Sequence, residues 1–244
     1  MIDTHAHLSI DYKSSELKFD VDSIILAAGS VEDARNNLCL MKINKKLFPA
    51  VGIHPHGANE DIDSHLEELE KLIRDNRQKI VAIGECGLEF DDTYNQKRQE
   101  KLFRKQIEMS IKYRKPLIIH SRKANDEVLE ILKQYPNTRG VIHCYTGGTK
   151  RINKVIELGE EWYFGIDGNL TYETGLENVV AEIPPHKLLL ETDCPELTPE
   201  PFRGEINNPN NIRYVYKKVA EIWKKSFEET EKIIDESAKK LFNL

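Results

Sequence analysis

The chain has 244 residues, of which 39% are hydrophobic and 31% charged, with a formal net charge of −6 and a pI near 5.8. This acidic balance argues against a protein that coats nucleic acid through a basic surface, because such binding neutralises many phosphates with Lys and Arg. Nucleic acid remains open as a substrate that is held locally. The length suits one domain with one large core, since a closed barrel of eight β/α units needs about 250 residues.

No segment approaches the roughly 18 consecutive apolar residues of a membrane span, so no membrane association is expected. The N-terminal residues lack a basic region followed by an apolar run, so no secretory signal is visible and a cytoplasmic location is expected. Without paired spacing, the cysteines are expected to be free thiols in a reducing compartment. They are Cys39, Cys86, Cys144 and Cys194.

Short β-rich runs alternate with amphipathic helical runs along the chain. Strands that alternate with helices pair in parallel through right-handed crossovers, and eight such units suit a closed barrel better than an open sheet. The sequence therefore predicts an α/β fold, a (β/α)8 TIM-type barrel, with residues 1–244 as a single domain. The predicted strands are residues 2–7, 22–28, 48–53, 80–85, 116–121, 140–144, 162–166 and 187–192.

Apolar stripes with helical spacing mark helices within residues 62–73, 102–111 and 128–132. After the eighth strand, a further stripe spans residues 212–222. A last helix is predicted to begin after Ser226, because Ser226 and Glu229 have the spacing of a capping box. We expect these two additional C-terminal helices to close the outside of the barrel.

Metal-competent side chains fall at the ends of five predicted strands. In a barrel the carboxyl ends of all strands open onto one rim, where barrel enzymes keep their active sites. The first two of these side chains also share a face of their strand, because they are two residues apart. The candidates are His5, His7, Glu85, His120, His143 and Asp193.

Four histidines and two carboxylates exceed what one four-coordinate ion can use while keeping an open position. We therefore expect two divalent metal ions per chain. Nitrogen and oxygen ligands without thiolates suit zinc, manganese or magnesium. The expected ligands are His5, His7 and Asp193 for one ion, His120 and His143 for the other, and Glu85 as a bridge between them.

Paired ions about 3.5–4 Å apart favour in-line displacement at a phosphoester, because they activate a water and neutralise charge on the phosphoryl oxygens. The predicted catalytic residues are Asp193, as proton acceptor or only as a ligand, and Glu85. Candidate contacts to the substrate phosphate are His54, Arg122 and Arg203. Guanidinium groups match phosphate geometry, although each arginine could instead pair with a rim carboxylate. The alternative for His54 is that it serves only to fix the conformation of its loop.

Other polar residues receive simpler interpretations. Three cysteines directly follow a proposed ligand, and they are expected to point toward the helices as small buried groups, because adjacent strand residues face opposite ways. The histidines outside the predicted strand ends are expected to be solvated. These are His56, His65 and His186.

Taken together, these segments resemble the TatD family of metal-dependent hydrolases, within the amidohydrolase-like barrels. The resemblance implies a TIM-type barrel with a divalent metal pair that hydrolyses DNA phosphodiesters, often as a 3′-to-5′ exonuclease. It places the ligand roles on the same six residues. The similar segments are residues 3–8, 48–56, 84–88, 99–106, 120–122, 143–147, 191–195, 201–204 and 208–209.

The chain departs from the family pattern at a few positions. It has Glu89 where the family commonly has Asp, and Tyr145 and Thr146 where Phe and Ser are common. These changes keep polarity or ring character. Glu196 stands where an aromatic residue is common, and a carboxylate beside the rim would repel a phosphate backbone.

We therefore expect a hydrolase of ester bonds, a metal-dependent deoxyribonuclease that takes DNA as single strands or strand ends, without an obligatory protein partner. The alternative on the same metal site is a carboxylic-ester hydrolase such as a D-aminoacyl-tRNA deacylase. A PHP-type phosphatase would have more rim histidines, and other amidohydrolases often have a modified lysine where this chain has Glu85. A metal-binding barrel without activity is the non-enzymatic alternative, and six converging ligands argue against it.

Overall fold

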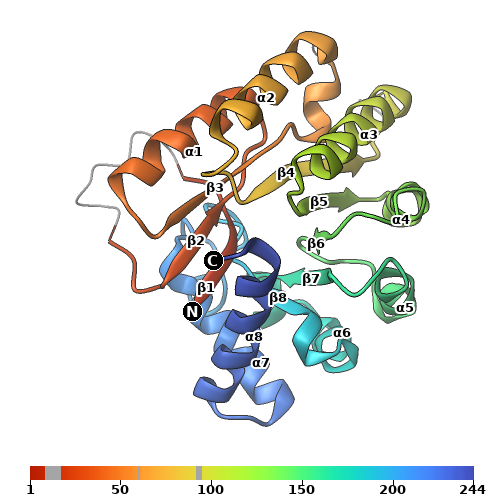
Figure 1. Cartoon of the computed structure of the whole chain (residues 1–244). Helices are drawn as coiled ribbons and strands as arrows, with labels where there is room; N and C mark the ends of the chain where they lie inside the picture. The colour runs from red at the N-terminus through yellow and green to blue at the C-terminus, as the bar shows by residue number, and fades with distance from the viewer. Residues whose placement is uncertain (9–17, 60, 92–94) are drawn as a thin grey trace.

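The computed structural model describes residues 1–8, 18–59, 61–91 and 95–244. Eight parallel strands follow one another in chain order, and helices surround them (Figure 1). This arrangement confirms the predicted (β/α)8 barrel. The strands are β1 (Ile2–Ala6), β2 (Ser23–Leu26), β3 (Leu47–Val51), β4 (Ala82–Glu89), β5 (Leu117–Arg122), β6 (Gly140–Ile142), β7 (Trp162–Ile166) and β8 (Leu188–Leu190).

The α-helices cover the outside of the strands and one end of the barrel. No helix in the described ranges is both long and apolar enough to cross a bilayer. The helices are α1 (Val31–Ile43), α2 (Ile62–Asn76), α3 (Gln96–Tyr113), α4 (Asn125–Lys133), α5 (Ile152–Ile156), α6 (Leu176–Glu182), α7 (Ile212–Trp223) and α8 (Phe227–Phe242).

The capping box predicted for the last helix is present at the start of α8. The Ser226 hydroxyl accepts a hydrogen bond from the backbone N–H of Glu229, and the Glu229 carboxylate accepts one from the backbone N–H of Ser226, each at 3.1 Å. These bonds satisfy two N–H groups that the first helical turn leaves without partners. The predicted start of this helix is therefore confirmed.

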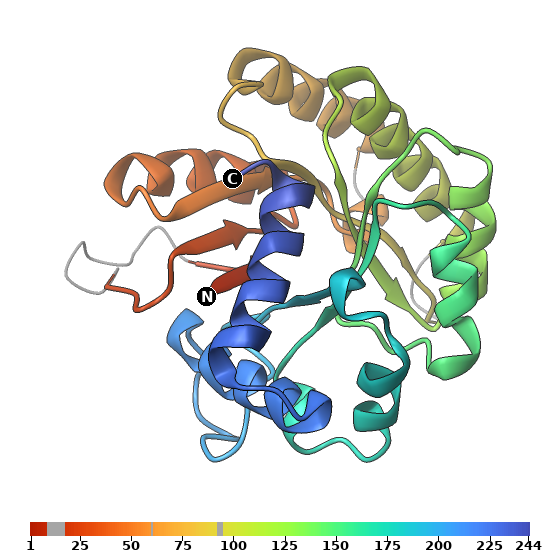
Figure 2. The ribbon, with the colours of Figure 1, turned by 60° about the horizontal axis from the view of Figure 1, so that its bottom comes forward.

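An apolar layer fills the N-terminal end of the barrel, and α8 covers it. Each strand contributes one side chain to this layer, and Ala238, Leu241 and Phe242 of α8 pack against it. The helix therefore lies across this end of the barrel (Figure 2). Our expectation that both C-terminal helices close the outside is wrong for α8, because the layer would otherwise be exposed to water. The layer consists of Ile2, Ile25, Ala50, Ala82, Ile118, Val141, Tyr163 and Leu189.

A register shift in β1 turns its histidines into the barrel. Ile2 belongs to the inner apolar layer, whereas Ala6 packs in the core that the helices share. Two even-numbered residues of a regular strand would face the same side, so the alternation changes between them. The pairing of β1 with β2 shifts between Asp3 and Ala6. Such an irregularity re-aims side chains, and here it directs His5 and His7 inward.

A second register shift turns Glu85 inward on β4. Ala82 lies in the inner layer, while Ile83 and Cys86 both pack toward the helices. The pairing of β4 with β5 shifts between Ile83 and Cys86. The strand then continues four residues beyond its predicted end, because its later residues pair with β5 as far as Glu89.

The position of Gly87 on β4 leaves no room for a side chain. Its φ is 149°, and a Cβ there would lie 1.9 Å from the carbonyl oxygen of His120 on β5. We expect Gly87→Ala to push the two strands apart and to lower the free energy of unfolding by about 2–4 kcal/mol. A lower urea midpoint with an unchanged slope would show this loss.

Gly175→Ala is the matched control for this substitution. Gly175 has a φ of 94°, and no atom lies within 4 Å of a Cβ built there. Its replacement should cost only the penalty of a left-handed backbone, about 1–2 kcal/mol. An equal loss in the two variants would show that the contact with His120 contributes nothing.

Candidate metal centre

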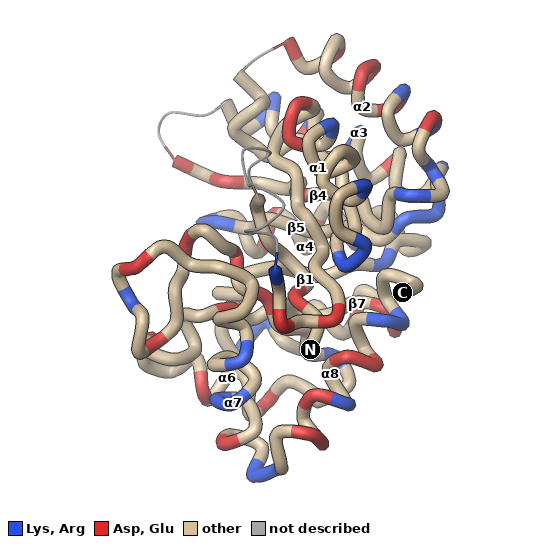
Figure 3. The backbone as a smooth tube through the Cα atoms, turned by 90° about the vertical axis from the view of Figure 1, so that its left-hand side faces the viewer, with Lys and Arg blue, Asp and Glu red and all other residues tan. Residues whose placement is uncertain are grey.

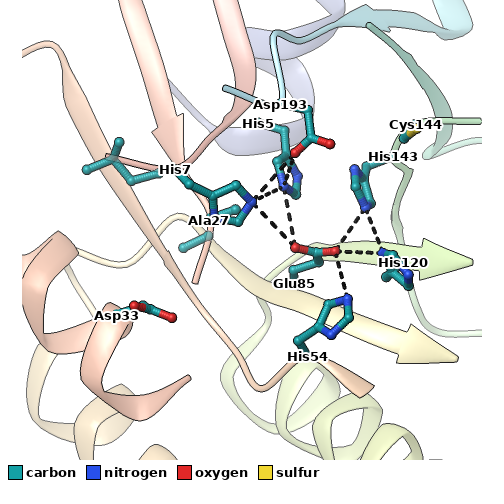
Figure 4. A network of polar contacts seen from close by, with 12 residues as sticks. His5, His7, Ala27, Asp33, His54, Glu85, His120, His143, Cys144 and Asp193 are labelled. Carbon is teal, nitrogen blue, oxygen red and sulfur yellow. Dashed lines mark hydrogen bonds and ion pairs between the residues drawn. The ribbon is translucent and has the colours of Figure 1, made fainter. Parts of the chain in front are cut away.

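The predicted ligands meet in one cavity of about 630 Å³ at the carboxyl ends of the strands. Figure 4 shows them gathered around the carboxylate of Glu85. His5 is completely buried beside the cavity, which the other five residues line. The potential ligand atoms form two groups, each within 4.8 Å. The first ligand group is His5, His7 and Asp193, and the second ligand group is Glu85, His120 and His143.

The first ligand group has the spacing of atoms that share one ion. The Nε2 atoms of His5 and His7 are 3.0 Å apart, and they lie 3.5 and 3.6 Å from Asp193 Oδ1. Two ligands that are each about 2.0–2.1 Å from a tetrahedral zinc lie about 3.3 Å from one another. A single cation between these three atoms would therefore meet each ligand at a normal distance.

The second ligand group has similar spacing on the other side of Glu85. Oε1 of Glu85 lies 2.7 Å from His120 Nδ1 and 3.1 Å from His143 Nε2, and these two nitrogens are 3.3 Å apart. The other oxygen of Glu85, Oε2, lies 3.5 Å from His5 Nε2. The carboxylate thus presents one oxygen to each group.

The chemistry of these residues fits bound cations. The side chains of His5 and His143 are buried, and their rings are stacked with centroids 4.1 Å apart. Their Nε2 atoms face the ligand groups, whereas the Nδ1 atoms of both rings have no hydrogen-bond partner within the described residues. Buried polar groups cost free energy unless they are paired or bind a metal. Imidazole and carboxylate ligands suit zinc and manganese, and in the described part of the chain no cysteine belongs to either group.

The two carboxylates of the centre are ionised. Burial raises the pKa of Glu85, but the charge of His143 and the hydrogen bond from His120 outweigh it, and the pKa lies well below 4.5. Burial opposes ionisation of Asp193 as well, and the hydrogen bond from His7 and the charge of His5 lower its pKa below 3.8. Both side chains therefore present anionic oxygens at neutral pH.

Nearby carboxylates raise the pKa values of three of the histidines. Burial lowers the pKa of His143, but Glu85 and Glu191 raise it well above 6.5. The pKa values of His7 and His120 are also raised, because their bonds to carboxylates outweigh burial. A metal ion that binds here therefore competes with protons for these rings.

We therefore expect metal binding to release protons and to weaken as the pH falls. The pKa values of His7, His120 and His143 in the folded protein lie above 6.5, so protons compete with the metal for these rings at and below neutral pH. The competition ends once the pH exceeds those pKa values. The apparent affinity should fall about tenfold per pH unit for each proton displaced. Calorimetric titration at pH 6 and pH 8, in buffers of different ionisation enthalpy, measures the affinity and the protons released. An affinity independent of pH would contradict this expectation.

Glu89 lies at the centre, although the sequence marked it only as a departure from a family pattern. It follows Glu85 and Gly87 on the inner face of β4, and its Oε2 lies 3.1 Å from Nε2 of His120. The hydrogen bond from His120 lowers the pKa of Glu89 to about 2. The alternation of residues 85, 87 and 89 is the sequence signal that could have identified it.

His56 also contacts Glu89, with its Nε2 3.0 Å from Oε2. Its side chain is 49% exposed, so the expectation of a solvated histidine holds only for part of the ring. Cys144 differs from its expected orientation as well. It lines the cavity, because β6 ends at Ile142 and the φ of Cys144 is 43°, so strand alternation no longer applies.

Glu191 is a second carboxylate that reasoning from the sequence missed. It is completely buried, and its Oε1 lies 3.5 Å from Nδ1 of His143. The same oxygen accepts a hydrogen bond from the backbone N–H of Cys144. A Cβ at Gly165 on β7 would lie 2.5 Å from Oε2, so the glycine provides the space for this carboxylate.

His54 points into the centre as a hydrogen-bond donor. Its Nδ1 accepts a hydrogen bond from the backbone N–H of His56 at 3.2 Å, which assigns the proton of the neutral ring to Nε2. That nitrogen lies 3.5 Å from Glu85 Oε1. Burial lowers the pKa of His54 to about 3, so the ring is neutral. The side chain therefore offers an N–H group rather than a ligand lone pair.

The two arginines predicted to contact substrate lie in different places. Arg122 lines the cavity, with its side chain 70% exposed and a guanidinium nitrogen 3.7 Å from Glu89 Oε1. The guanidinium of Arg203 lies 4.1 Å from the ring centroid of Tyr172. The hydroxyl of Tyr172 donates to Asn169, which lines the cavity. Of the two, Arg122 is therefore nearer to the ligand groups.

Comparison with known proteins agrees with this geometry. The family model described as TatD related DNase matches residues 2–243. The chain is 32% identical over 257 residues to YabD of Bacillus subtilis, described as an uncharacterized metal-dependent hydrolase, and the match covers 100% of this chain and 99% of that protein. It is 29% identical over 255 residues to another protein of that description, YjjV of Escherichia coli, covering 100% of this chain and 98% of YjjV.

Solved structures give the same result. The crystal structure of YjjV, a TatD homologue from Escherichia coli, superposes with a TM-score of 0.91 at 30% identity, covering 100% of this chain and 98% of that chain. A TatD family hydrolase from Entamoeba histolytica shares the fold, with a TM-score of 0.86 at 24% identity and coverage of 99% and 97%. With five metal-competent side chains around the carboxylate of Glu85 and a family match along nearly its whole length, the chain belongs to the TatD family of metal-dependent hydrolases.

Proposed function

We propose that this hydrolase is a deoxyribonuclease that binds two divalent ions and cleaves phosphodiester bonds at the ends of DNA strands, from the 3′ end. The observation that carries the proposal is the position of Glu85, which presents one oxygen to each ligand group. The open cavity beside both groups leaves room for water and a phosphate. The description of the matching family as TatD related DNase supports the same activity.

When bound, two such ions lower the pKa of an attacking water and neutralise charge on the phosphoryl oxygens. The side chains of the chain complete the reaction. Asp193 accepts the proton of the water, since only its Oδ1 lies within 4 Å of His5 and His7 in the described structure and Oδ2 remains available. His54 donates its Nε2–H to a phosphoryl oxygen.

The arginines position the DNA. Arg122 is the only Lys or Arg among the described residues that line the cavity, and it pairs with a second phosphate. Arg203, stacked on Tyr172, extends this contact to the strand that leaves the cavity. Acidic and basic residues are interspersed along α2 and α8 (Figure 3), and the net charge is −6. DNA is therefore held at the cavity by a few side chains, which suits single strands and strand ends better than a long duplex.

Carboxylic-ester hydrolysis is the second candidate function, and one observation favours it. The exposed carboxylate of Glu196 lines the cavity, where it would repel a phosphate and attract an ammonium group. An aminoacyl ester carries such an ammonium group next to the bond that is cleaved. A D-aminoacyl-tRNA would therefore fit the same metal site.

Two substrates separate these functions. Metal-free protein is reloaded with Mg²⁺, Mn²⁺ or Zn²⁺ and incubated with a 5′-labelled single-stranded oligonucleotide or with D-aminoacyl-tRNA. The proposal expects a ladder of products shortened from the 3′ end, which disappears when the metal is chelated. Release of the amino acid without shortening of DNA would establish the second candidate instead. Absence of both reactions with every metal would contradict both.

A further inference from the structure

The two ligand groups differ in what lies behind their histidines. His120 faces the centre through Nδ1, and its other nitrogen, Nε2, lies 3.1 Å from the carboxylate of Glu89. If Nδ1 binds a cation, Nε2 carries the ring proton and donates it to Glu89. This contact fixes the tautomer that leaves Nδ1 free to act as a ligand.

His143 also has a carboxylate behind it, that of Glu191 directly after β8, but at an ion-pair distance without the geometry of a hydrogen bond. The histidine faces the centre through Nε2, and its Nδ1 lies 3.5 Å from the carboxylate of Glu191. Gly165 keeps the space for that carboxylate, and the backbone N–H of Cys144 holds it in place. Both histidines of the second ligand group therefore have a buried carboxylate on the side away from the centre.

In the described part of the chain, no carboxylate lies within 4 Å of the histidines of the first ligand group on the side away from the centre. The carboxylates within 4 Å of His5 and His7 are Glu85 and Asp193, and both lie at the Nε2 atoms that face the centre. Nδ1 of His5, like Nδ1 of His143, has no hydrogen-bond partner among the described residues, and Glu191 lies within 4.8 Å of a nitrogen of His5 but makes its ion pair, at 3.5 Å, with His143. The first ligand group is also more open, because the side chain of His7 is 35% exposed and that of His143 only 4%.

We infer that the two cation positions are unequal, and that the second ligand group binds its ion first and more tightly because Glu89 and Glu191 position its histidines. This inference rests on the pair of ions in the proposed function. A carboxylate behind a ligating histidine fixes the ring and makes it a stronger ligand, and removing such a partner typically costs about 10–100-fold in metal affinity. The ion of the first ligand group is accordingly the exchangeable one.

Titration of the metal-free protein with Mn²⁺, followed by calorimetry without any substrate, tests the inference. Two binding steps are expected, with dissociation constants that differ by about tenfold or more. E89Q and E191Q should each weaken the tight step by about 10–100-fold and leave the weak step unchanged. The two variants alter different strands, so either one is decisive if the other fails to fold, which thermal melting shows.

E196Q is the matched control. Glu196 is an exposed carboxylate that lines the same cavity, and no contact between it and a ligating histidine occurs within the described residues. Its substitution removes one negative charge without removing a partner of a histidine, so both steps should stay within about twofold of the parent protein. The same loss in E196Q and E89Q would show that only the total charge matters and would overturn the inference.

Anomalous scattering identifies the position that fills first. In crystals of metal-free protein soaked with Mn²⁺ at a concentration between the two dissociation constants, the signal should lie at the second ligand group. Equal signals, or a stronger one at the first group, would overturn the inference while leaving the two-ion function in place. A single ion at saturation would contradict the two-ion function. If that single ion lay at the second ligand group and bound more weakly in E89Q, the inference would still be supported. If it lay at the first ligand group, the inference and the two-ion function would both be overturned.

Discussion

Glu85→Ala is expected to lower metal-dependent hydrolysis about a thousandfold or more, because it removes the carboxylate that presents one oxygen to each ligand group. Each of the two proposed ions would lose an anionic ligand, because one Glu85 oxygen lies at each ligand group. Metal content after dialysis should fall from two ions per chain to one or none. Elemental analysis of the variant and initial rates on the oligonucleotide measure the two effects.

The fold of this variant should persist, because the barrel core consists of apolar layers that do not include Glu85. Circular dichroism and a thermal melt check this point. Glu108→Ala is the control, since Glu108 on α3 is half exposed and pairs only with Lys105 three residues away among the contacts of the described residues. Unchanged turnover in Glu85→Ala would show that the hydrolysis does not depend on this metal centre, whose role would then be metal binding alone.

Asp193→Asn is expected to lower kcat by about 10²–10⁴-fold, the usual contribution of a general base. The amide keeps the size of the side chain and one oxygen near His5 and His7, but it cannot accept the proton of the water. Rates measured over a range of Mn²⁺ concentrations separate the two roles of Asp193. If Asp193 acts only as a ligand, excess Mn²⁺ would compensate for the weaker metal binding of the variant and restore the rate. If Asp193 is the general base, excess Mn²⁺ would not restore the rate.

Recovery of the parent rate at high Mn²⁺ would therefore show that Asp193 is a ligand without a role in proton transfer. Asp126→Asn provides the control, because Asp126 is a half-exposed carboxylate that pairs with Arg151 on the outside of the barrel. That variant should keep the parent rate at every metal concentration. A comparable loss in it would point to a general effect of the lost charge.

The gathering of the candidate ligands at one rim could be predicted because it depends on strand order. Parallel strands in a barrel all end on one rim, so a polar residue after each apolar run must lie near the others. His143 follows such a run directly, Asp193 comes three residues after one, and His120 lies near the end of one. Glu89 and Glu191 could not be recognised in this way, because their roles depend on which nitrogen of a neighbouring histidine faces them.

The sequence by itself determined the (β/α)8 barrel and the six metal-competent residues on its rim, because hydrophobic periodicity and strand order are local properties of the chain. Only the tertiary structure decided which side of each strand these residues face. The shifts in β1 and β4 arise where each strand pairs with its neighbour, and they reverse the alternation that Ile2 and Ala82 begin. The position of α8 across the barrel end was likewise decided by the apolar layer to which all eight strands contribute. No local sequence pattern contains that layer, because its residues are far apart along the chain.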